Sequence, residues 1–137
     1  MEQRRTDEIT TSDVGKIIYN RCRSFGVKDM IIAPNVPFSE ITSERLVIIV
    51  GDIHYGTIWN ECEVRVNWLV PNIADEPSAL RMDFVKGELL KLSYGIDEFN
   101  ERYYKFRKEV YGDGEDKDMR CHFAKITLSF KIQNIQK

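Results

Sequence analysis

The sequence contains two histidines, and their neighbours decide whether acid–base catalysis is available. His54 lies in a turn beside Asp52 and Tyr55, whereas His122 lies far along the chain in an alternating segment. A catalytic pair must lie within hydrogen-bond reach, and nothing in this spacing requires that. Cys121 precedes His122, but neighbours in a strand point to opposite faces, so the thiol and the imidazole should not touch. The sequence therefore predicts no catalytic residues, and an enzyme would have to use the His54–Asp52 turn.

Metal and cofactor sites are not predicted either. The acidic segment 112–118, GDGEDKD, resembles a calcium-binding loop only at first sight. Such a loop needs glycine at its sixth position and a bidentate acid at its twelfth, and counting from Asp113 these are Asp118 and Ala124. The chain has no G-x-x-x-x-G-K-[ST] or G-x-G-x-x-G phosphate motif. We therefore interpret 112–118 as a solvated turn and expect no metal and no cofactor.

The cysteines are Cys22, Cys62 and Cys121. Their number is odd and no C-x-x-C pair occurs, so neither a zinc ribbon nor a redox motif is supported. Free cysteine behaves as a small apolar side chain. We therefore expect three reduced, partly buried thiols.

Basic and aromatic side chains mix in residues 101–111, ERYYKFRKEVY. Platforms that bind single-stranded nucleic acid combine cations with aromatic rings in this way. An ordinary amphipathic strand has the same composition, and Glu101 and Glu109 interrupt the basic run. The segment therefore supports two interpretations: a structural or interface strand, or the site of a small nucleic-acid or protein binding module.

The 137-residue chain has the composition of a globular protein. Hydrophobic residues make up 42%, charged residues 31%, and the net charge is −2. These values exclude the disordered class and give none of the basic surplus that is usual in general nucleic-acid binders. No apolar run reaches the roughly 18 residues that span a bilayer, and residues 1–10 lack the apolar core of a secretory signal. We expect residues 1–10 to be a flexible arm, residues 11–137 to be a single α+β domain, and no membrane partner.

Hydrophobic periodicity predicts the elements that position these residues. They are, in order, a helix over 13–24, strands over 30–32, 43–50 and 57–70, a helix over 77–93, the segment 101–111 and a strand over 119–132. The pattern of 101–111 fits a helix or a strand, and its dense aromatic residues and the acidic turn after it favour a strand. Thr11, Ser12 and Asp13 are candidate N-caps of the first helix, and Gly26 and Gly95 are candidate stops. The glycine-bounded link 51–56 predicts a hairpin between its two flanking strands. This order predicts an α+β fold with a mainly antiparallel sheet and two helices packed on one face.

The strand over 57–70 has one polar face, and one large apolar residue interrupts it. Trp59 lies on that face with Glu61, Glu63 and Arg65. Exposed aromatic residues are enriched in protein interfaces, but a loop or the N-terminal arm would also account for Trp59 by covering it. We take these residues and His54 as candidate interface positions.

Five segments together resemble the tail-terminator and tail-completion proteins of long-tailed bacteriophages and prophages. They are SDVGKIIYNRC, ERLVIIV, ECEVRVNWLVPNI, PSALRMDFVKGELLKL and HFAKITLSFKI. The resemblance covers residues 11–134 and rests on pattern rather than on an invariant signature.

The resemblance implies a structural protein rather than an enzyme. Such proteins form a ring, commonly a hexamer, that caps the tail tube and joins it to the head connector. The expected partners are therefore other copies of this chain, a tail tube protein and a head–tail connector protein, with passage of DNA through the ring. The expected location is the virion tail or neck, after assembly in the bacterial cytoplasm.

Overall fold

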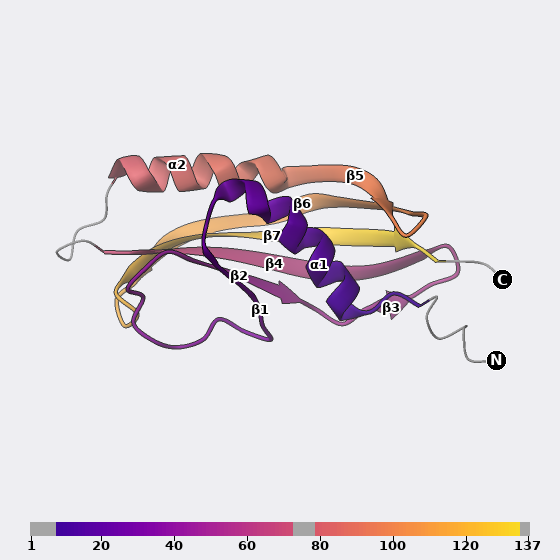
Figure 1. Ribbon diagram of the computed structural model, residues 1–137, viewed down its shortest axis with the longest axis horizontal. Helices are drawn as coiled ribbons and strands as arrows, with labels where there is room; N and C mark the ends of the chain where they lie inside the picture. Colours follow the sequence, from indigo (N-terminus) through magenta and orange to yellow (C-terminus); the bar gives the residue numbers. More distant parts are fainter. Residues whose placement is uncertain (1–7, 73–78, 135–137) are drawn as a thin grey trace.

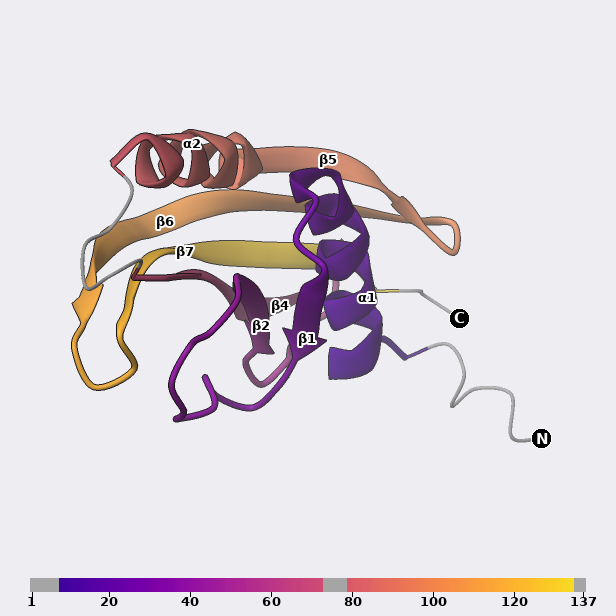
Figure 2. The same cartoon turned by 60° about the vertical axis from the view of Figure 1, so that its left-hand side comes forward.

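The computed structural model describes residues 8–72 and 79–134. Its elements, in chain order, are α1 (Thr11–Cys22), the 3-10 turn η2 (Arg23–Phe25), β1 (Asp29–Ile32), β2 (Arg45–Val50), β3 (His54–Tyr55), β4 (Trp59–Pro71), α2 (Ala79–Leu90), the 3-10 turn η3 (Lys91–Ser93), β5 (Tyr94–Phe99), β6 (Arg102–Asp116) and β7 (Cys121–Gln133). The strands form one sheet in the order β1–β2–β4–β7–β6–β5, with β3 paired to β4. Figures 1 and 2 show long, strongly twisted strands, with α1 crossing the sheet and α2 running into β5.

Both helices pack on the same face of the sheet, as the sequence predicts. Val14, Ile17 and Ile18 of α1 and Val85 and Leu89 of α2 belong to one buried cluster. The cluster continues through the inward residues of the central strands, which are Cys62, Val64, Val66, Trp68, Ala124, Ile126, Leu128 and Phe130. The fold is α+β with a mainly antiparallel sheet, because among the strands within 8–72 and 79–134 only the β1–β2 pair is parallel.

The central strands confirm the alternation read from the sequence. β4 pairs with β7 along its whole length, from Trp59 opposite Gln133 to Pro71 opposite Cys121. Each pair of opposite residues places its two side chains on the same face of the sheet. The apolar residues of β4 and β7 therefore pack together against the helices. β2 pairs antiparallel with β4, which confirms the predicted hairpin, and β2 is buried on both faces.

The start of α1 differs from the prediction. Its N-cap is Thr10, not Thr11, Ser12 or Asp13, because the Thr10 hydroxyl accepts from the Asp13 backbone N–H at 3.2 Å while the Asp13 carboxylate accepts from the Thr10 backbone N–H at 2.9 Å. This is a capping box. Of the expected arm over 1–10, residues 1–7 lie outside the described residues. Ile9 is 3% exposed and its carbonyl oxygen accepts from the Tyr55 hydroxyl at 2.7 Å, so it belongs to the fold.

The sequence analysis missed two strands. The short strand β3 occupies part of the predicted link 51–56, and β5 follows the second helix, where Gly95 was expected to be a helix stop. Gly95 instead lies inside β5 opposite Phe106. A tight turn joins β5 to β6 through Asn100 (φ 52°) and Glu101 (φ 68°), the positive φ values of a two-residue hairpin loop.

The turn predicted over 112–118 is also in the wrong place. β6 continues to Asp116, and the chain reverses over 117–120. The register slips between Lys108 and Val110, so a β-bulge interrupts the ladder with β7. Beyond the bulge, Gly112 and Gly114 are strand residues opposite Lys125 and Phe123.

A smaller apolar cluster covers one end of the opposite face. It consists of Ile41, Val47, Ile49, Leu69, Met119 and Cys121. The Ile41 backbone N–H donates to the Met119 carbonyl oxygen at 2.9 Å, which joins the loop before β2 to the turn before β7. These loops shield that end of the sheet, and the rest of the face is left to solvent.

Candidate interaction face

The side of the sheet that carries no helix is called here the open face. Its residues come from five strands and are His54, Trp59, Glu61, Glu63, Arg65, Tyr94, Ile96, Glu98, Tyr103, Lys105, Arg107, Glu109, Val110, Thr127, Ser129 and Lys131. Strand pairing orders many of them into rows across the sheet. One row runs from Tyr94 through Arg107 and Ser129 to Glu63, and the next runs from Ile96 through Lys105 and Lys131 to Glu61.

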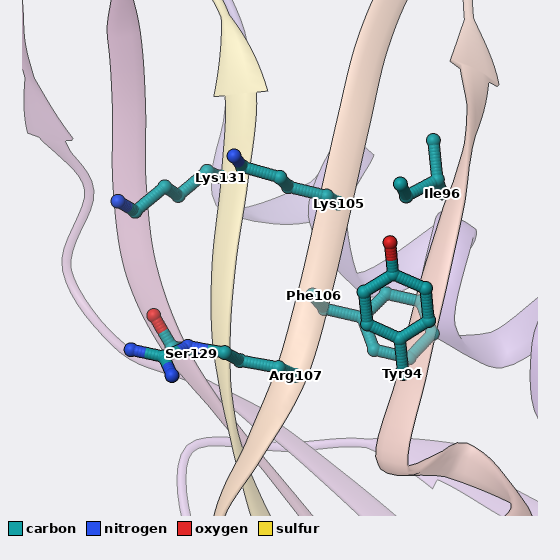
Figure 3. Close-up of a pocket in the computed structure, with 7 residues that line it drawn as sticks. All are labelled: Tyr94, Ile96, Lys105, Phe106, Arg107, Ser129 and Lys131. Carbon is teal, nitrogen blue, oxygen red and sulfur yellow. The ribbon is translucent and has the colours of Figure 1, made fainter.

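The part of the open face over β5, β6 and β7 is basic and aromatic. A shallow pocket of about 380 Å³ lies here, lined by Tyr94, Ile96, Lys105, Phe106, Arg107, Ser129 and Lys131. Figure 3 shows Lys105 and Arg107 extending from β6 toward β7, with Tyr94 and Ile96 on the neighbouring strand β5. We call Tyr94, Ile96, Tyr103, Lys105, Arg107 and Lys131 the basic half. Three cations gather here beside exposed apolar side chains.

The part of the open face over the loop before β3, β3 and the first half of β4 is acidic, and Glu109 of β6 adjoins it. Asp52, His54, Glu61, Glu63 and Glu109 line one shallow depression, and we call them the acidic half. His54 is exposed and lies opposite Glu61. Arg65 lies beside the acidic half. Its Nε lies 3.5 Å from the Glu63 carboxylate, and both side chains are 54% exposed. The open face therefore has a mainly basic part and a mainly acidic part, which meet where Lys131 lies opposite Glu61.

The structure brings together all five candidate interface residues of the sequence analysis. His54, Trp59, Glu61, Glu63 and Arg65 lie on adjacent strands of the open face. Trp59 is half-buried, and the Lys105 ammonium lies 5.0 Å from the centre of its ring. Lys105 of β6 therefore partly covers Trp59 of β4, and Trp59 lies between the acidic half and the basic half.

Sequence reasoning missed the contributions of β5 and β7 to this site. Tyr94 and Ile96 are 63% and 54% exposed, and they reach the open face only because the chain pairs as β5. The position of Lys131 opposite Lys105 depends on the β6–β7 register, which no local pattern gives. The segment 101–111 is a strand, as predicted, and it divides between two faces. Tyr104 and Phe106 are buried, so its platform is smaller than its composition indicates.

The groups that could perform catalysis are separated. His54 lies on the open face, whereas the His122 ring bonds to Asn72 Oδ1 at 2.7 Å, beside α2. Cys121 lies in the smaller apolar cluster, on the opposite face from His122. Burial raises the pKa of Cys22 and of Cys62 to about 12. Burial and then the Asp116 carboxylate raise the pKa of Cys121 to about 11. The thiols are therefore protonated at neutral pH and unsuited to nucleophilic attack.

Within 8–72 and 79–134, no group of three or more His, Cys, Asp or Glu side chains is arranged to hold a metal ion. Neither described helix combines the length and the apolar character that a membrane crossing requires.

A comparison with known protein families and a search of curated proteins each find no match to this chain.

Proposed function

We propose that this chain is a ring-forming assembly subunit of the tail-terminator type, in a bacteriophage or prophage tail. In this proposal the ring, commonly a hexamer, caps the tail tube, contacts the head connector and lets DNA pass. The resemblance of residues 11–134 to such proteins motivates it, and the α+β sheet with two helices on one face is consistent with it. The observation that carries it is the open face, which has the character of an interface.

The composition of the open face supports assembly rather than plain solvation. Tyr94, Ile96, Tyr103 and Val110 lie there and are each more than half exposed. Aromatic side chains and arginine are enriched at protein interfaces, and a patch that gathers them beside charged groups is typical of a binding surface.

The edge of the sheet supports the same conclusion. β5 is the last strand beside β6, so its outer backbone groups have no strand partner within residues 8–72 and 79–134. An unpaired edge is a template for pairing with another chain. Asp97 and Glu98 are charged residues of the kind that limit uncontrolled pairing at an edge. Such an edge favours a contact of defined geometry over open-ended aggregation.

Quaternary structure tests the proposal directly. Light scattering coupled to size-exclusion chromatography should give a particle of several chains, each of 16.1 kDa, at high protein concentration. Negative-stain microscopy should show a ring, because a heterologous contact repeated by a closing rotation forms a ring. A strict monomer at millimolar concentration would refute the proposal. A filament that never closes would refute the terminator role while leaving self-assembly.

The basic half favours one alternative, a small nucleic-acid binding module. Lys105, Arg107 and Lys131 lie beside Tyr94 and Tyr103, which is the pairing of cations with rings that holds single strands. Fluorescence anisotropy with a labelled single-stranded oligonucleotide should then show binding that weakens steeply with salt. Binding that is absent at low salt, or unchanged in K105A/R107A/K131A, would exclude this function.

A further inference from the structure

We infer that the basic half of one copy docks on the acidic half of the next copy, and that this contact is the repeating contact of the assembly. The inference rests on the proposed function, because it names the surfaces that join the subunits. The occupant of the open face is thus a second copy of this chain. Charge complementarity between the two halves is the main argument.

Most charged side chains of the two halves form no ion pair within the described residues, although the Lys105 ammonium lies 5.0 Å from the centre of the Trp59 ring and Lys131 lies opposite Glu61 in the strand pairing. Among the described residues, Lys105, Arg107 and Lys131 make no ion pair. The same holds in the acidic half for Asp52, Glu61 and Glu109. Glu63 has only its exposed contact with Arg65 at 3.5 Å, and a contact of this kind contributes little. Both halves therefore have charge available for an external partner.

The strand register places two like charges side by side in the basic half, and it places Glu61 on the other side of Lys131. Lys105 and Lys131 lie directly opposite each other on β6 and β7. Like charges in this position repel and destabilise a sheet. Arg107, two residues from Lys105 on the same face, adds a third positive charge. An anionic surface placed over this part of the sheet would relieve the repulsion, and the acidic half of another copy is such a surface.

The apolar residues of the open face contribute to the strength of the contact. Charged groups set the rate and the orientation of association more than its strength. A stable contact needs on the order of 1,000 Å² of buried surface with apolar anchors near its centre. Tyr94, Ile96 and Tyr103 lie within the basic half and Trp59 adjoins the acidic half. A head-to-tail contact uses a different patch on each partner, so it can repeat around a ring.

Two charge-reversed variants test this contact. K105E/R107E/K131E makes the basic half acidic, and E61K/E63K/E109K makes the acidic half basic. All six positions lie on the open face, and all but the half-buried Lys131 are exposed. Each variant should keep the fold, which circular dichroism and thermal unfolding can check.

Alone, each variant brings like charges together, and its dissociation constant should rise by about a hundredfold or more. An equimolar mixture should assemble again, because every contact in an alternating assembly then joins opposite charges. Analytical ultracentrifugation measures both results.

A matched control separates this contact from a general effect of charge. K16E/R23E/K28E makes the same change in net charge as K105E/R107E/K131E, at exposed positions outside the open face, and it should assemble like the wild type. Variants that assemble as well as the wild type, or whose mixture fails to reassemble, would overturn the inference.

The two proposals fail in different ways. A wild-type assembly that tolerates both reversals would leave the proposed ring in place and refute the contact. Assembly that stops at two chains, is lost in each variant and returns in the mixture would establish the contact and refute the ring. A monomeric wild type would refute both.

Discussion

Replacing Glu44 with alanine should destabilise the protein far more than its position in a loop indicates. The Glu44 carboxylate accepts from Trp68 Nε1 at 3.1 Å and from Arg81 Nε and Nη2 at 2.5 Å and 2.6 Å. Trp68 is fully buried in β4, and Arg81 belongs to α2. One side chain thus connects the loop before β2, the central sheet and the second helix.

The expected loss of stability follows from the hydrogen bonds that the substitution removes. An unpaired buried indole N–H costs about 1–3 kcal/mol. The Arg81–Glu44 pair adds only about 0.2–1 kcal/mol, because the two side chains are 38% and 24% exposed and solvent screens them. The free energy of unfolding should therefore fall by about 2–3 kcal/mol, which is a drop in Tm of about 8 °C for a chain of this size.

Differential scanning calorimetry or thermal circular dichroism measures this change. Glu44→Gln keeps an acceptor for the indole and should lose about half as much stability. Asp29→Ala breaks the Arg45–Asp29 pair, at 2.8 Å on the surface, without exposing a buried donor, so it should cost no more than about 1 kcal/mol. The reasoning is refuted if Glu44→Ala shifts Tm no more than Asp29→Ala does.

The same network should make stability depend on acidity. Burial raises the pKa of Glu44, but the hydrogen bonds from Arg81 and Trp68 outweigh it, and the pKa lies below its ordinary value of 4.5. A lowered folded-state pKa means that this stabilisation is complete above pH 4.5 and is lost as the pH falls below it. The wild type should therefore lose more stability than Glu44→Ala in that acid range.

Further predictions concern the core and the thiols. Gly95→Ala should cost about 1–3 kcal/mol, because the added Cβ would overlap the Phe106 ring and approach the Arg21 guanidinium carbon to 3.2 Å. The control is Gly87→Ala in α2, where a Cβ meets nothing within 4 Å, so the free energy of unfolding should rise by about 0.5–1 kcal/mol. Urea unfolding compares the two variants, and equal destabilisation would contradict the predicted overlap at Gly95. All three cysteines should resist a thiol reagent at pH 8 and react fully in denaturant, and rapid labelling of the native protein would contradict their burial.

Local patterns predicted the central part of this fold. The alternation in 57–70 placed Glu61, Glu63 and Arg65 on one face of β4, because the side-chain direction repeats every two residues whatever the partner strand is. The same reasoning separated Cys121 from His122 and placed Trp59 on the polar face. Buried β-branched residues likewise predicted the doubly covered strand β2.

Local patterns failed at the edge of the sheet. β5, YGIDEF, has a glycine and two acids, and its apolar residues follow no strict alternation. It is a strand because β6 offers a partner along Arg102–Arg107, and its turn uses Asn100 and Glu101 without a glycine. Pairing with a neighbour outweighed weak propensity here.

The chain's sequence by itself determined which side chains of the central strand β4 point away from the helices, whereas those of β5 reached the open face only through strand pairing. Only the tertiary structure decided which of them are neighbours. Lys105 meets Lys131, and Glu44 meets Trp68 and Arg81, through contacts between segments far apart in the chain. A repeat of two fixes the face of a residue from its own strand, but the register between strands is set by long-range pairing and packing, which no local pattern records.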